Sequence, residues 1–191
     1  MTGIIILVIL AAVVIFGIIK AVGGYNDLVT LRNRVDNQSA QVDVQLKRRA
    51  ELVPNLIETV KGYAKFEKST LTDITELRSR VMNAGNTSEA CAADAKLGRA
   101  CSQILALGES YPELKSNTNF LKLQEELADT ENKIVMARQF YNDTVTKYNT
   151  AIQMFPKSVV AGIFGFQKRE LLAIAEAERE AVRIDSNTFT L

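Results

Sequence analysis

An uninterrupted apolar run near the start of the chain constrains the fold more than any other feature. Residues 4–22 read IIILVILAAVVIFGIIKAV, nineteen residues whose one charge, Lys20, lies close to the end. About 20 apolar residues span a bilayer as a helix. The sequence therefore predicts a transmembrane anchor, with the lipid bilayer as its partner. Most of the 191 residues remain for a single domain with one continuous core.

A cleaved secretory signal is the competing interpretation of this run. Such a signal has a basic start, a shorter apolar core and a small-residue cleavage site. Only Met1–Gly3 precede the run here, and the run is too long for that pattern. We therefore expect an uncleaved, single-pass anchor. The residues taken to represent its membrane-embedded part are Ile4, Leu7, Leu10, Val14 and Ile18.

Basic residues are more frequent after the anchor than before it. Lys20, Arg32 and Arg34 follow or end the run, whereas only the terminal amine precedes it. Positive charge close to a membrane tends to stay in the cytoplasm. The sequence therefore predicts a cytoplasmic soluble part and an N-terminus outside the membrane.

The next part of the chain repeats apolar side chains at steps of three and four. This period predicts an amphipathic helix from about Tyr25 to Met82, roughly 87 Å long if unbroken. Pro54 lies inside it and is expected to kink it near residues 50–53. Gly23 and Gly24 precede it and are expected to form a flexible joint with the anchor.

Two further helices are predicted from turn residues and periodicity. Residues 83–88 read NAGNTS, and a second helix is expected to follow them and to stop near residues 108–112. Asn117 or Asn119 is expected to cap a third helix that ends at Pro156. Residues 25–156 are thus predicted to form an all-α, antiparallel long-helix bundle of three to four helices, the first of them kinked near Pro54.

The C-terminal part divides into a short apolar stretch, a helix-prone stretch and a tail. Residues 158–166 read SVVAGIFGF and are expected to be an apolar loop, and the helix after them to end near residue 184. Residues 157–184 are expected to pack on or near the bundle, and 185–191 to be a frayed tail. The loop is the best candidate for an exposed binding surface, for the membrane or for another copy. Its candidate partner-binding residues are Ile163, Phe164 and Phe166.

Three consecutive cations, Lys47, Arg48 and Arg49, form a second candidate binding surface. A solvated helix face is the simpler interpretation. Lipid headgroups are disfavoured, because 23 helical residues beyond Gly24 correspond to about 35 Å, well beyond the reach of screened charge. A patch for an acidic protein partner passes that distance test.

The composition argues against catalysis and against nucleic-acid binding. The chain lacks histidine, which removes the usual near-neutral acid-base group and the commonest metal ligand. We expect no cofactor and no metal. The formal charge of +1 offers no strong field for nucleic acid. Cys91 and Cys101 are about 15 Å apart along one predicted helix, too far for a disulfide, and are expected to be small buried residues.

Four phrases of the sequence resemble the LemA family of bacteria. They are YNDLVTLRNRV at 25–35, VQLKRRAELVPNLIETVKGYAKFE at 44–67, LQEELADTENKIVMARQFYNDTVTKYNTAIQMFP at 123–156 and AGIFGF at 161–166. The resemblance implies a bacterial cell-membrane protein with an anchor and an antiparallel helical bundle. It also implies a link to specialised membranes in some relatives. It supplies no catalytic residues.

The leading functional hypothesis is a non-enzymatic scaffold that recruits an unidentified protein partner or forms a homo-oligomer. Confinement to a membrane raises effective concentration, so weak contacts suffice. The alternative is a membrane-tethered sensor or signalling adaptor that relays an unknown ligand by helix shift, with Pro54, Gly23 and Gly24 as adjustable points.

Overall fold

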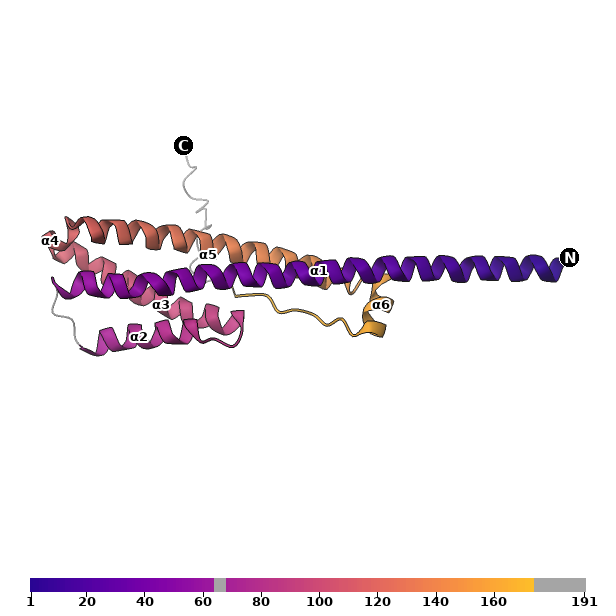
Figure 1. Ribbon diagram of the computed structural model, residues 1–191, viewed down its shortest axis with the longest axis horizontal. Coiled ribbons are helices and arrows are strands. Elements are labelled where there is room, and N and C mark those ends of the chain that lie inside the picture. The colour runs from indigo at the N-terminus through magenta and orange to yellow at the C-terminus, as the bar shows by residue number, and fades with distance from the viewer. Residues whose placement is uncertain (64–67, 174–191) are drawn as a thin grey trace, which may run out of the picture. The chain divides into compact units, whose positions relative to one another are not determined.

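A computed structural model describes residues 1–63 and 68–173 of the chain. Every regular element in those ranges is a helix, and no strand occurs among them (Figure 1). The predicted all-α class is therefore confirmed. Contacts divide the chain into two compact units, described separately here: unit 1 combines residues 1–41 with 139–171, and unit 2 combines residues 42–138 with the chain from residue 172.

The anchor and the first soluble helix form one helix, α1, from Thr2 to Lys61. Gly23 and Gly24 lie inside α1, so the predicted joint is not a break in the helix. Gly24 is buried, and a Cβ atom there would lie 3.6 Å from side-chain atoms of both Lys157 and Val160. The segment around residues 157–160 therefore packs against the helix at Gly24, at a distance that a Cβ atom would also permit.

α1 also continues through Pro54. Proline has no N–H, so the carbonyl of Ala50, four residues earlier, loses its helical donor. The Nε of Arg78 donates a hydrogen bond to that carbonyl at 2.9 Å. Arg78 belongs to α2, Lys68–Met82, so another helix supplies the donor that proline lacks.

The prediction of a single helix over residues 25–82 is wrong. α1 ends at Lys61, a turn follows at Gly62 and Tyr63, and α2 begins separately at Lys68. The sequence pattern continues across this gap because both helices turn an apolar face to the same core. Glycine at position 62 has a low helix propensity, which fits a helix end there.

The boundary between α2 and α3 lies at the predicted turn. α3 runs from Thr87 to Leu107, and its N-cap Asn86 accepts a hydrogen bond from the backbone N–H of Glu89 at 2.9 Å. The Glu89 carboxylate accepts in turn from the backbone N–H of Gly85 at 3.1 Å. These local bonds satisfy helix-end donors, and α2 and α3 then lie side by side (Figure 1).

Two short elements lead from α3 to the second long helix: η1, Gly108–Ser110, and α4, Pro112–Lys115. The second long helix is α5, Thr118–Ala151. The side chain of Asn117 accepts from the backbone N–H groups of Asn119 at 2.9 Å and Phe120 at 3.1 Å. Asn117 is thus the cap, and the predicted start of this helix is confirmed. Its end falls at Ala151, ahead of the predicted stop at Pro156.

The stretch predicted as an apolar loop is instead a helix, α6, Lys157–Phe164. Gly165 ends it in the left-handed conformation, with φ 70° and ψ 31°. The backbone N–H groups of Gly165 and Phe166 both donate to the carbonyl of Ala161, the arrangement of a glycine C-cap. Gly165 therefore ends α6, a helix too short to be recognised from its sequence pattern.

The helix predicted after residue 166 does not form in the described part, because residues 167–173 are non-helical. The rest of that prediction, residues 174–184, and the predicted tail, 185–191, lie outside the described residues. Side-chain hydrogen bonds hold the backbone of residues 167–170, which replaces the bonds a helix would make.

Each unit has its own apolar core. Unit 1 buries Leu28, Val35, Tyr141, Val145, Tyr148, Val160 and Ala161. Unit 2 buries Val42, Leu46, Val53, Leu56, Val60, Ile74, Val81, Leu97, Ile104, Leu114, Phe120, Leu127 and Ile134. Most of these belong to the stripes predicted from three- and four-residue spacing.

Candidate functional site

The N-terminal part of α1 presents an apolar surface that nothing in the described chain covers. Residues 4–22 are exposed throughout, and α1 is the one described helix that is long and apolar enough to cross a membrane. The predicted anchor residues all lie on this exposed part: Ile4, Leu7, Leu10, Val14 and Ile18. This length and composition make α1 a candidate membrane span.

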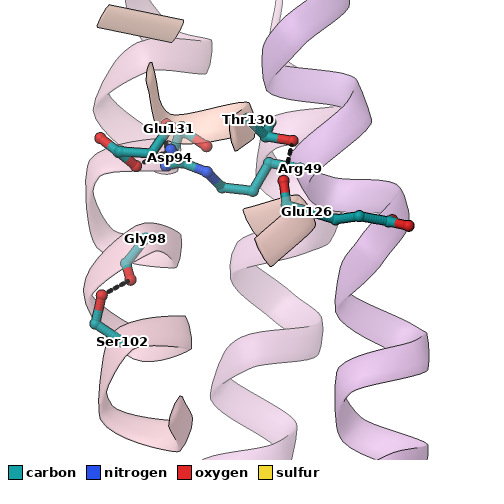
Figure 2. Close-up of polar contacts among 7 residues, drawn as sticks. All are labelled: Arg49, Asp94, Gly98, Ser102, Glu126, Thr130 and Glu131. Atoms are coloured by element: carbon teal, nitrogen blue, oxygen red, sulfur yellow. Dashed lines mark hydrogen bonds and ion pairs between the residues drawn. The ribbon is translucent and has the colours of Figure 1, made fainter. Parts of the chain in front are cut away.

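A buried ion cluster lies in unit 2, where α1, α3 and α5 meet. Arg49 of α1 is only 3% exposed, and its Nη1 donates to the Asp94 carboxylate of α3 at 2.8 Å. Its Nη2 pairs with Glu131 of α5. Figure 2 shows the guanidinium directed at both carboxylates. One cation thus joins three helices that are distant in sequence.

The backbone around this cluster is shaped to admit the guanidinium. A Cβ atom on Gly98 would lie 2.8 Å from Arg49 Nη1, closer than atoms normally approach. The Gly98 carbonyl accepts from the Ser102 hydroxyl at 3.0 Å, and the fully buried Thr130 donates to the Glu126 carbonyl at 2.7 Å (Figure 2). Glycine at position 98 leaves the space that Arg49 occupies.

Burial dominates the electrostatics of this cluster. Desolvation raises the pKa of Asp94 to about 6, even though Arg49 beside it favours the charged form. Asp94 Oδ1 is buried without a hydrogen-bond partner. Removal from water likewise raises the pKa of Cys91 and Cys101 to about 11, so both thiols stay protonated. They are free and buried, as predicted.

The predicted basic patch does not exist as a continuous surface. Lys47 and Arg48 are exposed, but Arg49 is buried in the ion cluster. Its inclusion among the partner-binding residues is therefore wrong. The reason is its position, because Arg49 falls at the same helical spacing as the core residues Leu46 and Val53.

Sequence reasoning missed Asp94, Glu131 and Gly98, although one signal was present. Asp94 lies three residues after Cys91 and seven before Cys101, in register with the buried face of α3. A charge at such a position is rarely buried without a partner. Two opposite charges at core positions, here Arg49 and Asp94, therefore indicate a buried pair.

In unit 1, α5 holds the non-helical segment of residues 165–171, here called the strap. The hydroxyls of Tyr148 and Tyr141 donate to the carbonyls of Gln167 at 2.9 Å and Glu170 at 3.1 Å. Asn149 makes two bonds with Arg169, at 2.8 Å to its carbonyl and 2.9 Å from its N–H. These polar side chains replace the backbone partners that a non-helical segment lacks.

Aromatic contacts connect the strap and α6 to α1. The ring of Tyr25 lies 4.7 Å from that of Phe164 and 5.8 Å from that of Phe166, between ring centroids. The Arg32 guanidinium lies 5.3 Å from the Phe166 ring centroid. Phe166 therefore makes intramolecular contacts, and less of its side chain is available to a partner than the sequence predicted.

Ile163 remains highly exposed, at 73%, and Phe164 is exposed beside its contact with Tyr25. Two partly exposed ion pairs also join this region to α1: Lys157 Nζ to Asp27 at 2.9 Å, and Arg169 Nη2 to Asp36 at 3.1 Å. Unit 1 therefore presents an apolar surface held in a defined position.

Among the described residues, no group of histidine, cysteine and acidic side chains is arranged to hold a metal ion.

Comparison with known proteins adds a family to this geometry. A model of the LemA family matches residues 38–185. The chain belongs to the LemA family. The family match begins after the anchor and includes every residue of the buried ion cluster and of the strap.

The similar proteins carry two kinds of name. Protein LemA of Metamycoplasma hominis is 27% identical over 89% of this chain and 76% of its own length. Magnetosome protein MamQ of Magnetospirillum gryphiswaldense is 24% identical over 76% of this chain. Magnetosome protein MamQ 2 of Paramagnetospirillum magneticum is 23% identical over the same share. The matched region spans 63% of the length of both MamQ proteins.

Proposed function

We propose that this protein is a single-pass, membrane-anchored helical scaffold that binds partners or other copies of itself and performs no catalysis. The observation that carries the proposal is the continuity of α1. One helix begins with the exposed apolar residues 4–22 and continues, without a break, into residues that pack in both units, such as Leu28 and Leu46. Within unit 1, the candidate membrane span is therefore continuous with a helix of the packed core, which includes Leu28 and Val35.

The site chemistry supports binding more than catalysis. The buried thiols stay protonated, and Arg49 and Asp94 lie within the packed helices of unit 2, whereas Glu131, the other partner of Arg49, is exposed. The exposed groups are instead apolar on α6 and basic at Lys47 and Arg48. An antiparallel helical bundle, a bacterial cell-membrane location and a cytoplasmic soluble part with the N-terminus outside complete the proposal.

The names of the MamQ relatives place those proteins at the magnetosome. From this we extend the proposal to a role in organising or remodelling membranes. Since this chain matches 63% of their length, the extension concerns the shared helical region and not their complete activity.

Mass measurement of the full-length protein in native-lipid nanodiscs tests the proposal. Mass photometry is expected to find particles with more than one copy, or particles with a co-purifying protein. Lys47→Glu with Arg48→Glu separates the two cases, because reversal of both charges should release an acidic partner and leave self-assembly through other surfaces. Strictly monomeric particles that retain no partner would contradict the scaffold proposal.

A sensor is a second candidate, and one observation favours it. Asp94 is buried between helices, and its pKa of about 6 makes its charge sensitive to small changes in pH or in bound charge. Hydrogen exchange of the full-length protein at about pH 5 and about pH 7 tests this idea. A pH-dependent change in the protection factors of α3 that Asp94→Asn abolishes would support it, and identical protection factors at both pH values would exclude it.

A further inference from the structure

We propose that α6 is a second membrane contact, which inserts its outer apolar face into the lipid headgroup layer beside the anchor. The inference rests on the proposed function, because it requires α1 to span a membrane. It concerns unit 1 alone, in which α6 and the N-terminal part of α1 belong to one compact unit.

The position of α6 along α1 supports this assignment. Its residues Lys157 and Val160 approach Gly24, and Phe164 contacts Tyr25. These α1 positions are two and three residues past Val22, the last residue of the apolar run, or about 3–5 Å along the helix axis. The headgroup layer is roughly 5–7 Å thick on each side of the hydrocarbon core. α6 is thus held at headgroup depth.

The two faces of α6 differ as an interfacial helix requires. Val160 and Ala161 are buried against the unit, whereas Val159 and Ile163, four residues apart and so on one face, are exposed. Met154 and Phe155, which precede the helix in the sequence, are exposed as well.

Charge around α6 also suits a lipid surface. Lys157 is the only charged residue of the helix, and its ammonium group pairs with Asp27 at 2.9 Å. Tyr25, on the inner side of α6, is of the residue type enriched at membrane interfaces. The outer face of the helix, around Val159 and Ile163, therefore carries no charge that lipid would have to desolvate.

The small size of the surface favours lipid over a second copy of the chain. α6 has eight residues, of which one face is exposed. A stable protein interface buries about 800 Å² on each partner, usually from 20–30 residues. A membrane covers a small apolar face without such an area, because the adjacent span already holds the protein at the bilayer.

The absence of tryptophan from the chain permits a direct test in the full-length protein. Ile163→Trp introduces a single fluorophore on the outer face of α6, and Phe140→Trp places a matched one at an exposed site on α5 of the same unit. Phe16→Trp places a third in the anchor. Each variant is reconstituted into phosphatidylcholine vesicles with and without bromine on the upper part of the acyl chains.

We expect brominated lipid to quench the Ile163→Trp and Phe16→Trp variants, the former by roughly half, and to leave Phe140→Trp unchanged, because interfacial helices insert about 5–10 Å. Val159→Trp, on the same face, should behave as Ile163→Trp does. If the two variants give the same result, that result cannot be a local effect of one substitution.

Other results overturn the inference in distinguishable ways. Quenching of Phe16→Trp alone would leave the anchored scaffold intact and place α6 in water. A blue-shifted but unquenched Ile163→Trp signal would show that protein, from a second copy or a partner, covers α6. No quenching of Phe16→Trp would contradict the membrane span and the inference together.

Discussion

The two units place charge and apolar surface in opposite ways. Unit 2 buries Arg49 and Asp94 within its helices, whereas unit 1 keeps its ion pairs near the surface and leaves Ile163 exposed. A buried ion needs its partner, because desolvation exceeds what any single contact returns. An exposed apolar face needs a cover, and the adjacent anchor offers the bilayer. Stability should therefore depend on pairing in unit 2 and on the backbone conformation of α6 in unit 1.

The largest effect is expected from Arg49→Ala, which leaves the Asp94 carboxylate buried without its cation. Breaking a buried pair from one side costs about 3–5 kcal/mol. Urea unfolding of the full-length protein in mild detergent, followed by circular dichroism, measures the loss. The neighbouring Arg48→Ala removes an exposed cation and should change stability by less than about 0.5 kcal/mol. Equal effects of the two variants would contradict the assigned role of the cluster.

The second prediction concerns pH. The folded-state pKa of Asp94 is raised from 3.8 to about 6, so folding favours its protonated form. Its contribution is fully present below pH 3.8 and is lost as the pH rises through about 6, a difference on the order of 3 kcal/mol. Stability measured across this window should fall less in Asp94→Asn than in the wild type. Parallel curves would show that Asp94 titrates normally.

The third prediction concerns the carbonyl that Pro54 leaves without a helical donor. Arg78→Ala removes the replacement hydrogen bond to Ala50 and should cost about 2 kcal/mol, the penalty of an unsatisfied buried group. In a Pro54→Ala background the new backbone N–H can serve that carbonyl, so Arg78→Ala should cost less. A double-mutant cycle from unfolding curves measures the coupling. Additive effects would indicate that Arg78 acts through other contacts.

The smallest effect is expected in unit 1. Gly165 has φ 70°, where a side chain is strained, so Gly165→Ala should cost about 1 kcal/mol. Gly162 lies inside α6, and a Cβ there meets nothing within 4 Å, so Gly162→Ala should stabilise the helix slightly. Hydrogen exchange of residues 157–164 measures both. Opposite changes in protection are expected, and similar changes would contradict the assigned end of α6.

Much of the fold follows from local pattern. The apolar run predicts an exposed N-terminal helical span, and the three- and four-residue stripes predict the buried faces. The turn at residues 83–88 and the Asn117 cap are predicted because a cap bonds to neighbours two or three residues away. The α6 helix was not predicted because a short, mainly apolar stretch is equally typical of a loop that packs on a core.

The candidate sites divide in the same way. The exposure of Ile163 was predicted, since it follows from an apolar stretch with no charged partner. The burial of Arg49 was not, and neither was the continuity of α1 through Gly24 and Pro54. Distant segments supply two of the partners: Asp94 pairs with Arg49, and Arg78 donates to the carbonyl near Pro54.

Local sequence patterns were enough to predict that most of residues 2–151 are helical, which stretch is apolar enough for a membrane and where most turns lie, because these features depend on neighbours within a few residues. The helix α6, the non-helical segment after it and the burial of individual charges depend on packing and were not predicted. Arg49 is buried beside Asp94, 45 residues away, and the Ala50 carbonyl near Pro54 receives its hydrogen bond from Arg78, 28 residues away. Helical periodicity predicts the direction in which a side chain points, whereas the packing of the helices determines which residues that side chain contacts.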